Sequence, residues 1–126
     1  MRTPVFVGFE AVVELHQLGL EKFGGAQGVR DRGAIESALA AAKNDFFYAN
    51  ADLFAIAAAY AFHLAQAQAF LDGNKRVAVA VALAFLARNG IAAIPNEDRL
   101  YDAMIGIAER RLTKADLAQV LRELFG

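Results

Sequence analysis

The chain has 126 residues and no cysteine, so it suits a single domain without disulfide bonds or thiolate metal sites. Its formal net charge of −1 argues against wholesale binding to a phosphate backbone, and nucleic acid is therefore not an expected direct partner. No apolar run reaches the roughly 20 residues that span a membrane and no signal peptide opens the chain, which predicts one cytoplasmic domain over residues 1–126.

The spacing of apolar residues and the positions of helix-capping residues predict six helices. Asp31, Asp52 and Asn96 stand where N-caps are expected. Thr113 and Asp116 resemble a capping box at the start of the last helix. The expected elements are a minor strand or extended lead-in over 3–7, helices over 9–23, 32–42, 53–69, 74–89, 97–110 and 114 to 124 or 125, and a short extended segment over 91–94.

The fourth helix is expected to lie at the centre of the fold. Its apolar run over 77–87 alternates alanine with larger side chains, which is also a strand pattern. Two features favour a helix: the run is longer than an ordinary strand, and it ends at 88–90 in a basic turn followed by glycine. The sequence therefore predicts a mainly all-α fold, a compact bundle of about six helices around a buried helix over about 74–89.

A turn rich in hydrogen-bond donors comes directly before this helix. The first N–H groups of a helix lack intrahelical partners and lie at the positive end of its dipole. Gly73, Asn74 and Lys75 are therefore expected to bind phosphate through their amides. Lys75 and Arg76 add full positive charges. Asp72, an acceptor among donors, is expected to hold a Mg²⁺ ion that accompanies the phosphates of a nucleotide.

Residues 70–76, Phe-Leu-Asp-Gly-Asn-Lys-Arg, resemble the signature loop of the Fic/Doc superfamily in the form typical of death-on-curing (Doc) toxins. Further matches cover most of the chain: Leu15-His16, Phe23-Gly24-Gly25, Gly28-Val29-Arg30-Asp31, Glu36-Ser37-Ala38-Leu39, Phe85-Leu86 and Asn89-Gly90. The resemblance implies a Fic/Doc-like fold and a toxin of a bacterial toxin–antitoxin system. Such an enzyme moves a phosphoryl or nucleotidyl (AMP) group from ATP or another NTP, bound with Mg²⁺, to a Ser, Thr or Tyr hydroxyl of a protein.

The resemblance also implies partners and roles. Doc-type toxins act on a translation factor and are held by a cognate antitoxin, so both are expected here. In this family the aspartate, here Asp72, sets the metal, and Gly73 and Asn74 bind the phosphates. Lys75 and Arg76 stabilise charge on the group being transferred.

One position departs from the family pattern. The family signature opens two places before the phenylalanine with a histidine, the general base that takes the proton of the acceptor hydroxyl, and here that position is Gln68. A carboxamide has no useful basicity. His63 lies five residues earlier, about 140° around a helix, and is not expected to replace it. The sequence predicts an intact nucleotide site with an impaired catalyst; the alternative is an inactive nucleotide- or antitoxin-binding module of the same fold.

Several residues have two interpretations. Gln68 is either part of the active site or a last-turn residue that bonds free helix carbonyls. His16 is either a structural histidine bonded to the backbone or a helper that fixes the signature loop from behind. Arg30 either reaches a phosphate or forms an ion pair.

Three adjacent aromatic residues, Phe46, Phe47 and Tyr48, stand in a segment that cannot turn all of them inward. In one interpretation two of them fill the core and the third caps it. In the other, which follows from the resemblance, they form a partly exposed apolar surface that docks the target protein or the antitoxin.

Overall fold

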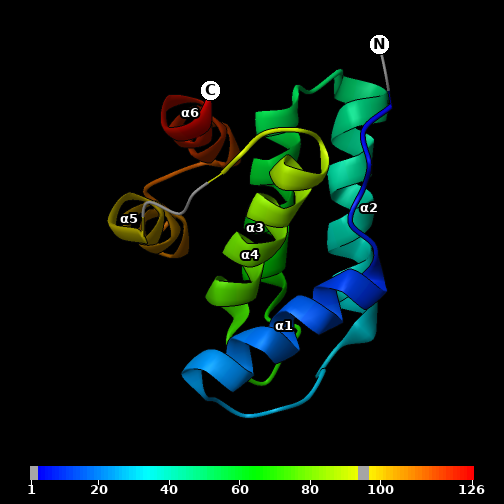
Figure 1. Cartoon of the computed structure of the whole chain (residues 1–126), viewed down its shortest axis with the longest axis vertical. Helices are drawn as coiled ribbons and strands as arrows, with labels where there is room; N and C mark the ends of the chain where they lie inside the picture. The colour runs from blue at the N-terminus through cyan, green and yellow to red at the C-terminus, as the bar shows by residue number, and fades with distance from the viewer. Residues whose placement is uncertain (1–2, 94–96) are drawn as a thin grey trace.

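The computed structural model describes residues 3–93 and 97–126, and this part of the chain folds into six helices joined by short loops (Figure 1). They are α1 (Phe9–Phe23), α2 (Arg32–Ala49), α3 (Leu53–Ala67), α4 (Asn74–Arg88), α5 (Glu97–Ala108) and α6 (Lys114–Phe125). The mainly all-α prediction is confirmed. Among the described residues, no helix combines the length and the apolar character that crossing a membrane would need.

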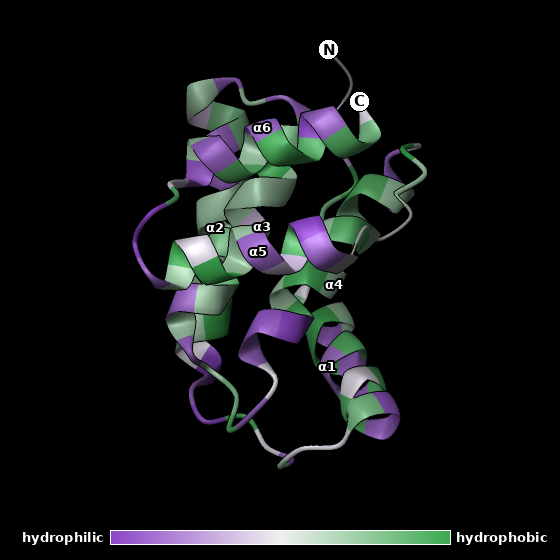
Figure 2. Cartoon of the chain, turned by 90° about the vertical axis from the view of Figure 1, so that its left-hand side faces the viewer, coloured by the Kyte–Doolittle hydropathy of each residue, from purple (hydrophilic) through white to green (hydrophobic). Residues whose placement is uncertain are grey.

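The central helix expected over about 74–89 is α4, and it shares the centre of the bundle with α3. The two helices lie side by side, with α2 on one side of α3, α5 and α6 on the other, and α1 crossing α4 (Figure 1). Alanines at 57–59 and 61 are buried, and their small side chains let the neighbouring helices approach α3 closely. The outer helices α1 and α6 carry hydrophilic and hydrophobic residues side by side along their length, as two-sided helices do (Figure 2).

Three of the four predicted caps are present. The side chains of Asp31 and Asp52 accept from the amides of the third residue after each, at 3.0 and 2.8 Å. Thr113 and Asp116 form the reciprocal capping box. The predicted cap Asn96 lies outside the described residues, as does the end of the extended segment predicted over 91–94.

The second helix is longer than predicted. The expected end at about Ala42 is wrong, because the sequence contains no glycine or proline until well beyond it, and α2 continues to Ala49. It stops at Asn50, which adopts the left-handed conformation with φ 53° and donates its N–H to the carbonyl of Asp45. The segment that carries the three adjacent aromatics is therefore helix rather than loop.

The N-terminal lead-in is extended and makes no strand pairing in the described structure. Val7 is buried, and its N–H donates to the hydroxyl oxygen of Tyr60 at 3.0 Å. The side-chain amide of Asn89 pairs with the backbone of Val5, accepting from its N–H at 2.7 Å and donating to its carbonyl at 3.0 Å. The end of α4 thus anchors the start of the chain.

Candidate nucleotide site

The signature loop lies where α3 ends and α4 begins. α4 starts at Asn74, with Gly73 as its N-cap in the left-handed conformation at φ 77°, which favours glycine. No side chain caps this helix, and its first intrahelical bond runs from the N–H of Val77 to the carbonyl of Gly73 at 3.0 Å. The amides of residues 74–76 therefore stand at the positive end of the dipole without a side-chain partner, as a phosphate site requires.

The side chain of Asn74 closes the signature loop on itself. Its Oδ1 accepts from the N–H of Phe70 at 3.1 Å, and its Nδ2 donates to the carbonyl of Phe70 at 3.0 Å. A third contact runs from Nδ2 to Oε1 of Gln68 at 3.4 Å. Asn74 thus contributes to the site by fixing the path of the backbone around it.

Gln68 ends α3 in the left-handed conformation, at φ 50°. Its Nε2 donates to the carbonyl of Ala65 at 2.8 Å, as a last-turn residue does, while its Oε1 faces Asn74. The last-turn interpretation of Gln68 is therefore confirmed, and its contact with Asn74 puts it beside the signature loop, where its active-site role stays a prediction. Arg30 donates from its guanidinium to the carbonyl of Gln68 and, among the described residues, joins no ion pair, so the ion-pair interpretation is wrong.

Asp72 is exposed at the mouth of the site. Its Oδ1 accepts from the N–H of Gly73 at 2.8 Å, and its Oδ2 lies 3.4 Å from the N–H of Ala26, in the loop that follows α1. Within the described part of the chain, no cluster of three or more metal-binding side chains occurs. A lone exposed carboxylate beside a phosphate site fits Mg²⁺, which keeps several waters and takes one or two carboxylates together with substrate phosphates.

The two basic residues point in different directions. Lys75 is exposed in the first turn of α4. Arg76 lies over the ring of Phe23 on α1, with its guanidinium carbon 4.4 Å from the ring centroid. The structure therefore gathers Asp72, Gly73 and Lys75 at the start of α4, while Arg76 lies against α1.

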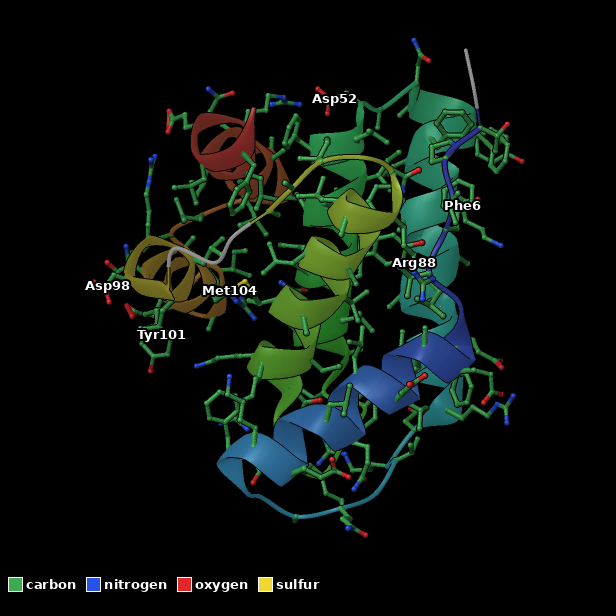
Figure 3. The ribbon with its side chains drawn as sticks, viewed as in Figure 1. Phe6, Asp52, Arg88, Asp98, Tyr101 and Met104 are labelled. Atoms are coloured by element: carbon green, nitrogen blue, oxygen red, sulfur yellow. The ribbon has the colours of Figure 1, made fainter. Side chains whose placement is uncertain are left out.

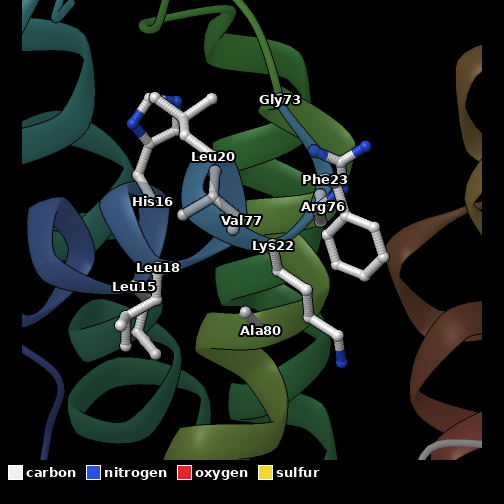
Figure 4. A pocket seen from close by; sticks show the side chains of 11 residues that line it. Leu15, His16, Leu18, Leu20, Lys22, Phe23, Gly73, Arg76, Val77 and Ala80 are labelled. Carbon is white, nitrogen blue, oxygen red and sulfur yellow. The ribbon is translucent and has the colours of Figure 1, made fainter. Parts of the chain in front are cut away.

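Arg76 also lines a groove between α1 and α4 that sequence analysis missed (Figure 4). The groove has a volume of about 190 Å³ and reaches Gly73. Two large apolar side chains of α1 stand exposed along it, Leu18 at 53% and Phe23 at 57%. In the sequence, the only local indication of this surface was that these two apolar residues stand among the polar residues of α1. The remaining lining residues are Leu15, His16, Gly19, Leu20, Lys22, Val77 and Ala80.

His16 makes contacts that fit both of its interpretations. It is buried, with 6% of its surface exposed, and its Nε2 lies 2.7 Å from the carbonyl oxygen of Asp72. Its ring stacks on Phe70 with centroids 3.8 Å apart and an interplanar angle of 16°. The backbone group that His16 contacts and the ring on which it stacks both belong to the signature loop.

His63, the second of the two histidines, lies elsewhere. It is half-buried on α3, with its Nε2 3.3 Å from Nζ of Lys114, which in turn pairs with Asp45 at 2.9 Å. Burial, with a smaller contribution from the charge of Lys114, lowers the pKa of His63. Neither histidine therefore supplies a base at the position of Gln68.

The lowered pKa of His63 predicts a pH-dependent stability. In the unfolded chain His63 has its ordinary pKa of about 6.5, and in the folded chain its pKa is lower. The neutral imidazole therefore contributes its full stability above pH 6.5. This contribution is lost as the pH falls through the lowered pKa of the folded state. We expect the free energy of unfolding, from urea titrations, to fall between pH 7.5 and pH 5 more steeply in the parent chain than in His63→Gln. Equal slopes in the two proteins would contradict this origin.

The aromatic residues 46–48 lie away from the signature loop. Phe46 is half-buried against Phe6, but Phe47 and Tyr48 are 59% and 86% exposed, so the interpretation in which two of them fill the core is wrong. Phe6, beside α2 in Figure 3, also stacks on Phe85. Phe85 lies about 16 Å along α4 from its first residue at 1.5 Å per residue, so the structure does not bring this surface to the nucleotide site.

Comparison with known proteins bears on the family of the chain. A sequence model of the Fic/DOC family matches residues 6–86. The chain is similar to protein kinase doc of Escherichia phage P1, with 32% identity over 118 residues that cover 93% of each protein. It is also similar to toxin Doc of Mycolicibacterium smegmatis, with 39% identity over 108 residues, which cover 82% of this chain and 81% of the relative.

Proposed function

The chain belongs to the Fic/DOC family, and from this premise we propose that it is a Doc-like toxin of a bacterial toxin–antitoxin system with a kinase-type activity. It takes a phosphoryl group, or in the nucleotidyl variant an AMP group, from ATP or another NTP. The acceptor is a Ser, Thr or Tyr hydroxyl of a protein, with a translation factor as the first candidate.

The start of α4 carries this proposal. Its uncapped amides, its dipole and the exposed Lys75 together favour a polyphosphate. Asp72 would hold a Mg²⁺ ion, which when bound neutralises charge on the phosphates. The N–H of Asn74 would bind a phosphate oxygen and keep the transferring group in place, and the N–H of Gly73 would join it once the Asp72 carboxylate, which accepts from it here, turns to the metal. Lys75 would stabilise its charge, with Arg76 joining once it leaves Phe23.

Gln68 makes the transfer slow. Its Nε2 is bonded to Ala65 and its Oε1 faces Asn74, so it can position an acceptor hydroxyl only weakly and cannot take its proton. We propose that the acceptor proton leaves to solvent, at a rate below that of an enzyme with a positioned base. A second candidate function is a module that binds nucleotide or antitoxin without turnover. It is supported by the contacts of the two histidines, since His16 contacts Asp72 and His63 contacts Lys114, and neither stands where a base is needed.

The groove between α1 and α4 is the surface we propose for the cognate antitoxin. It is apolar along its length, it is flanked by Lys22 and Arg76, and it ends at Gly73. An antitoxin segment with apolar and acidic residues suits this surface, and its presence there would cover the nucleotide site. The aromatic surface at 46–48 is the second candidate for docking a target or antitoxin, and a partner bound there would leave the nucleotide site open.

Calorimetry and label transfer test the proposal together. The parent chain is expected to bind Mg·ATP and to transfer label slowly from γ-labelled ATP to a protein of a bacterial extract. Label transferred from α-labelled ATP instead would identify nucleotidyl transfer. Binding without any transfer would favour the binding module, and no binding of Mg·ATP would refute a nucleotide-dependent function.

A further inference from the structure

We propose that His16 is a positioning residue of the nucleotide site: it holds the peptide between Asp72 and Gly73 in the orientation that presents the start of α4 to a phosphate. The inference builds on the proposed function and extends it to a residue of α1 that lies behind the signature loop and is not among the groups proposed to bind the nucleotide.

The contact with Asp72 fixes the state of the imidazole. A backbone carbonyl oxygen can only accept, so the His16 nitrogen 2.7 Å from it, Nε2, must carry a proton. The ring face rests on Phe70 at a centroid distance of 3.8 Å. One side chain therefore holds the signature loop at two points, through the ring of Phe70 and through the backbone of Asp72.

The peptide that His16 holds is the one that sets the geometry of the site. The carbonyl of Asp72 and the N–H of Gly73 belong to a single planar unit. His16 bonds one end of this unit, and the Asp72 carboxylate accepts from the other end at 2.8 Å. Rotation of the plane would turn the Gly73 amide away from the site, change the left-handed conformation of Gly73, and swing the carboxylate that we expect to hold the metal.

Packing alone does not account for a histidine here. Among the described residues, His16 is the only polar or charged residue in the buried class. Its neighbours Leu15 and Leu20 on α1 are apolar, and a phenylalanine would fill the same space without a buried polar atom. The hydrogen bond to Asp72 is therefore what distinguishes histidine from an apolar residue at this position.

Two variants separate the hydrogen bond from the packing. His16→Phe keeps a ring on Phe70 but loses the donor, whereas His16→Gln keeps a donor near the position of Nε2 but loses the ring. We expect His16→Phe to raise the dissociation constant of Mg·ATP by about three- to tenfold, the range for one lost hydrogen bond. His16→Gln is expected to bind within about twofold of the parent chain although it is the less stable variant in thermal unfolding.

A purely structural role predicts the opposite order, because affinity would then follow stability and the Gln variant would bind less well than the Phe variant. A second readout needs no nucleotide: hydrogen exchange of the Gly73 and Asn74 amides is expected to be faster in His16→Phe than in the parent or in His16→Gln. Equal exchange in all three proteins would overturn the inference. If the parent chain does not bind Mg·ATP, the proposed function fails, and the exchange comparison still decides whether His16 holds this peptide.

Discussion

Replacing Gln68 with histidine is expected to raise the rate of label transfer from ATP by about 10²–10⁴-fold, the contribution of a positioned general base. Asp72, Gly73 and Lys75 stand at the start of α4, while Arg76 lies over Phe23 in the parent and in the variant alike, so the added base is the difference that the comparison measures. A rise of this size corresponds to roughly 3–5 kcal/mol of barrier. The measurement is the initial rate of transfer at saturating Mg·ATP, with the same extract as the source of acceptor.

Matched controls isolate the effect of the base. Gln66→His places the same imidazole two residues earlier on α3, at an exposed position. Among the described residues, Gln66 makes no hydrogen bond with the signature loop, so this variant should leave the rate unchanged. Gln68→Ala removes the contacts with Ala65 and Asn74 without adding a base, and it should not accelerate transfer. Acceleration by either control, or none by Gln68→His, would mean that the missing base is not what limits this chain.

The start of α4 could be predicted from local sequence because each of its determinants is local. A donor-rich turn with glycine at the N-cap precedes an alanine-rich run that favours helix. The structure places Gly73 in the left-handed conformation that such a turn requires. The capping box at Thr113 was predictable for the same reason, since its two partners lie three residues apart.

The features that sequence analysis missed depend on contacts between distant segments. The last two turns of α2 carry Phe46, whose ring packs against Phe6, forty residues earlier in the chain. The groove exists only because α1 crosses α4 and leaves Phe23 beneath Arg76. Periodicity identifies the apolar face of a helix, but it does not say which neighbour covers that face or how much of it stays open.

The bond between His16 and Asp72 joins residues 56 positions apart, and it shows how a residue far along the chain enters the site. His16 had two interpretations, of which the structural one was favoured, because a helix pattern carries no information about which segment a buried side chain contacts. The structure makes the two compatible, since the backbone group that His16 bonds belongs to the signature loop itself.

Replacing Asn74 with alanine is expected to weaken the binding of Mg·ATP by about 10- to 100-fold. The side chain makes two hydrogen bonds with the backbone of Phe70, at 3.1 and 3.0 Å, and each is worth about 0.5–1.5 kcal/mol. Their loss frees the turn that aims the first amides of α4. The measurement is the calorimetric dissociation constant, and Asn44→Ala, at an exposed position of α2, is the control expected to leave it unchanged.

Asn74→Asp tests whether the site works through the shape of the loop or through charge as well. Aspartate keeps the acceptor for the N–H of Phe70 and places a negative charge in the first turn of α4, which favours the helix. The same charge repels a phosphate. We therefore expect Asn74→Asp to unfold at a temperature at or above that of Asn74→Ala and yet to bind Mg·ATP at least as weakly. The same comparison is made with ATP in the absence of Mg²⁺, because a second carboxylate could otherwise tighten binding through the metal ion. Tighter binding of Mg-free ATP by the Asp variant than by Asn74→Ala would contradict an anion site at the start of α4.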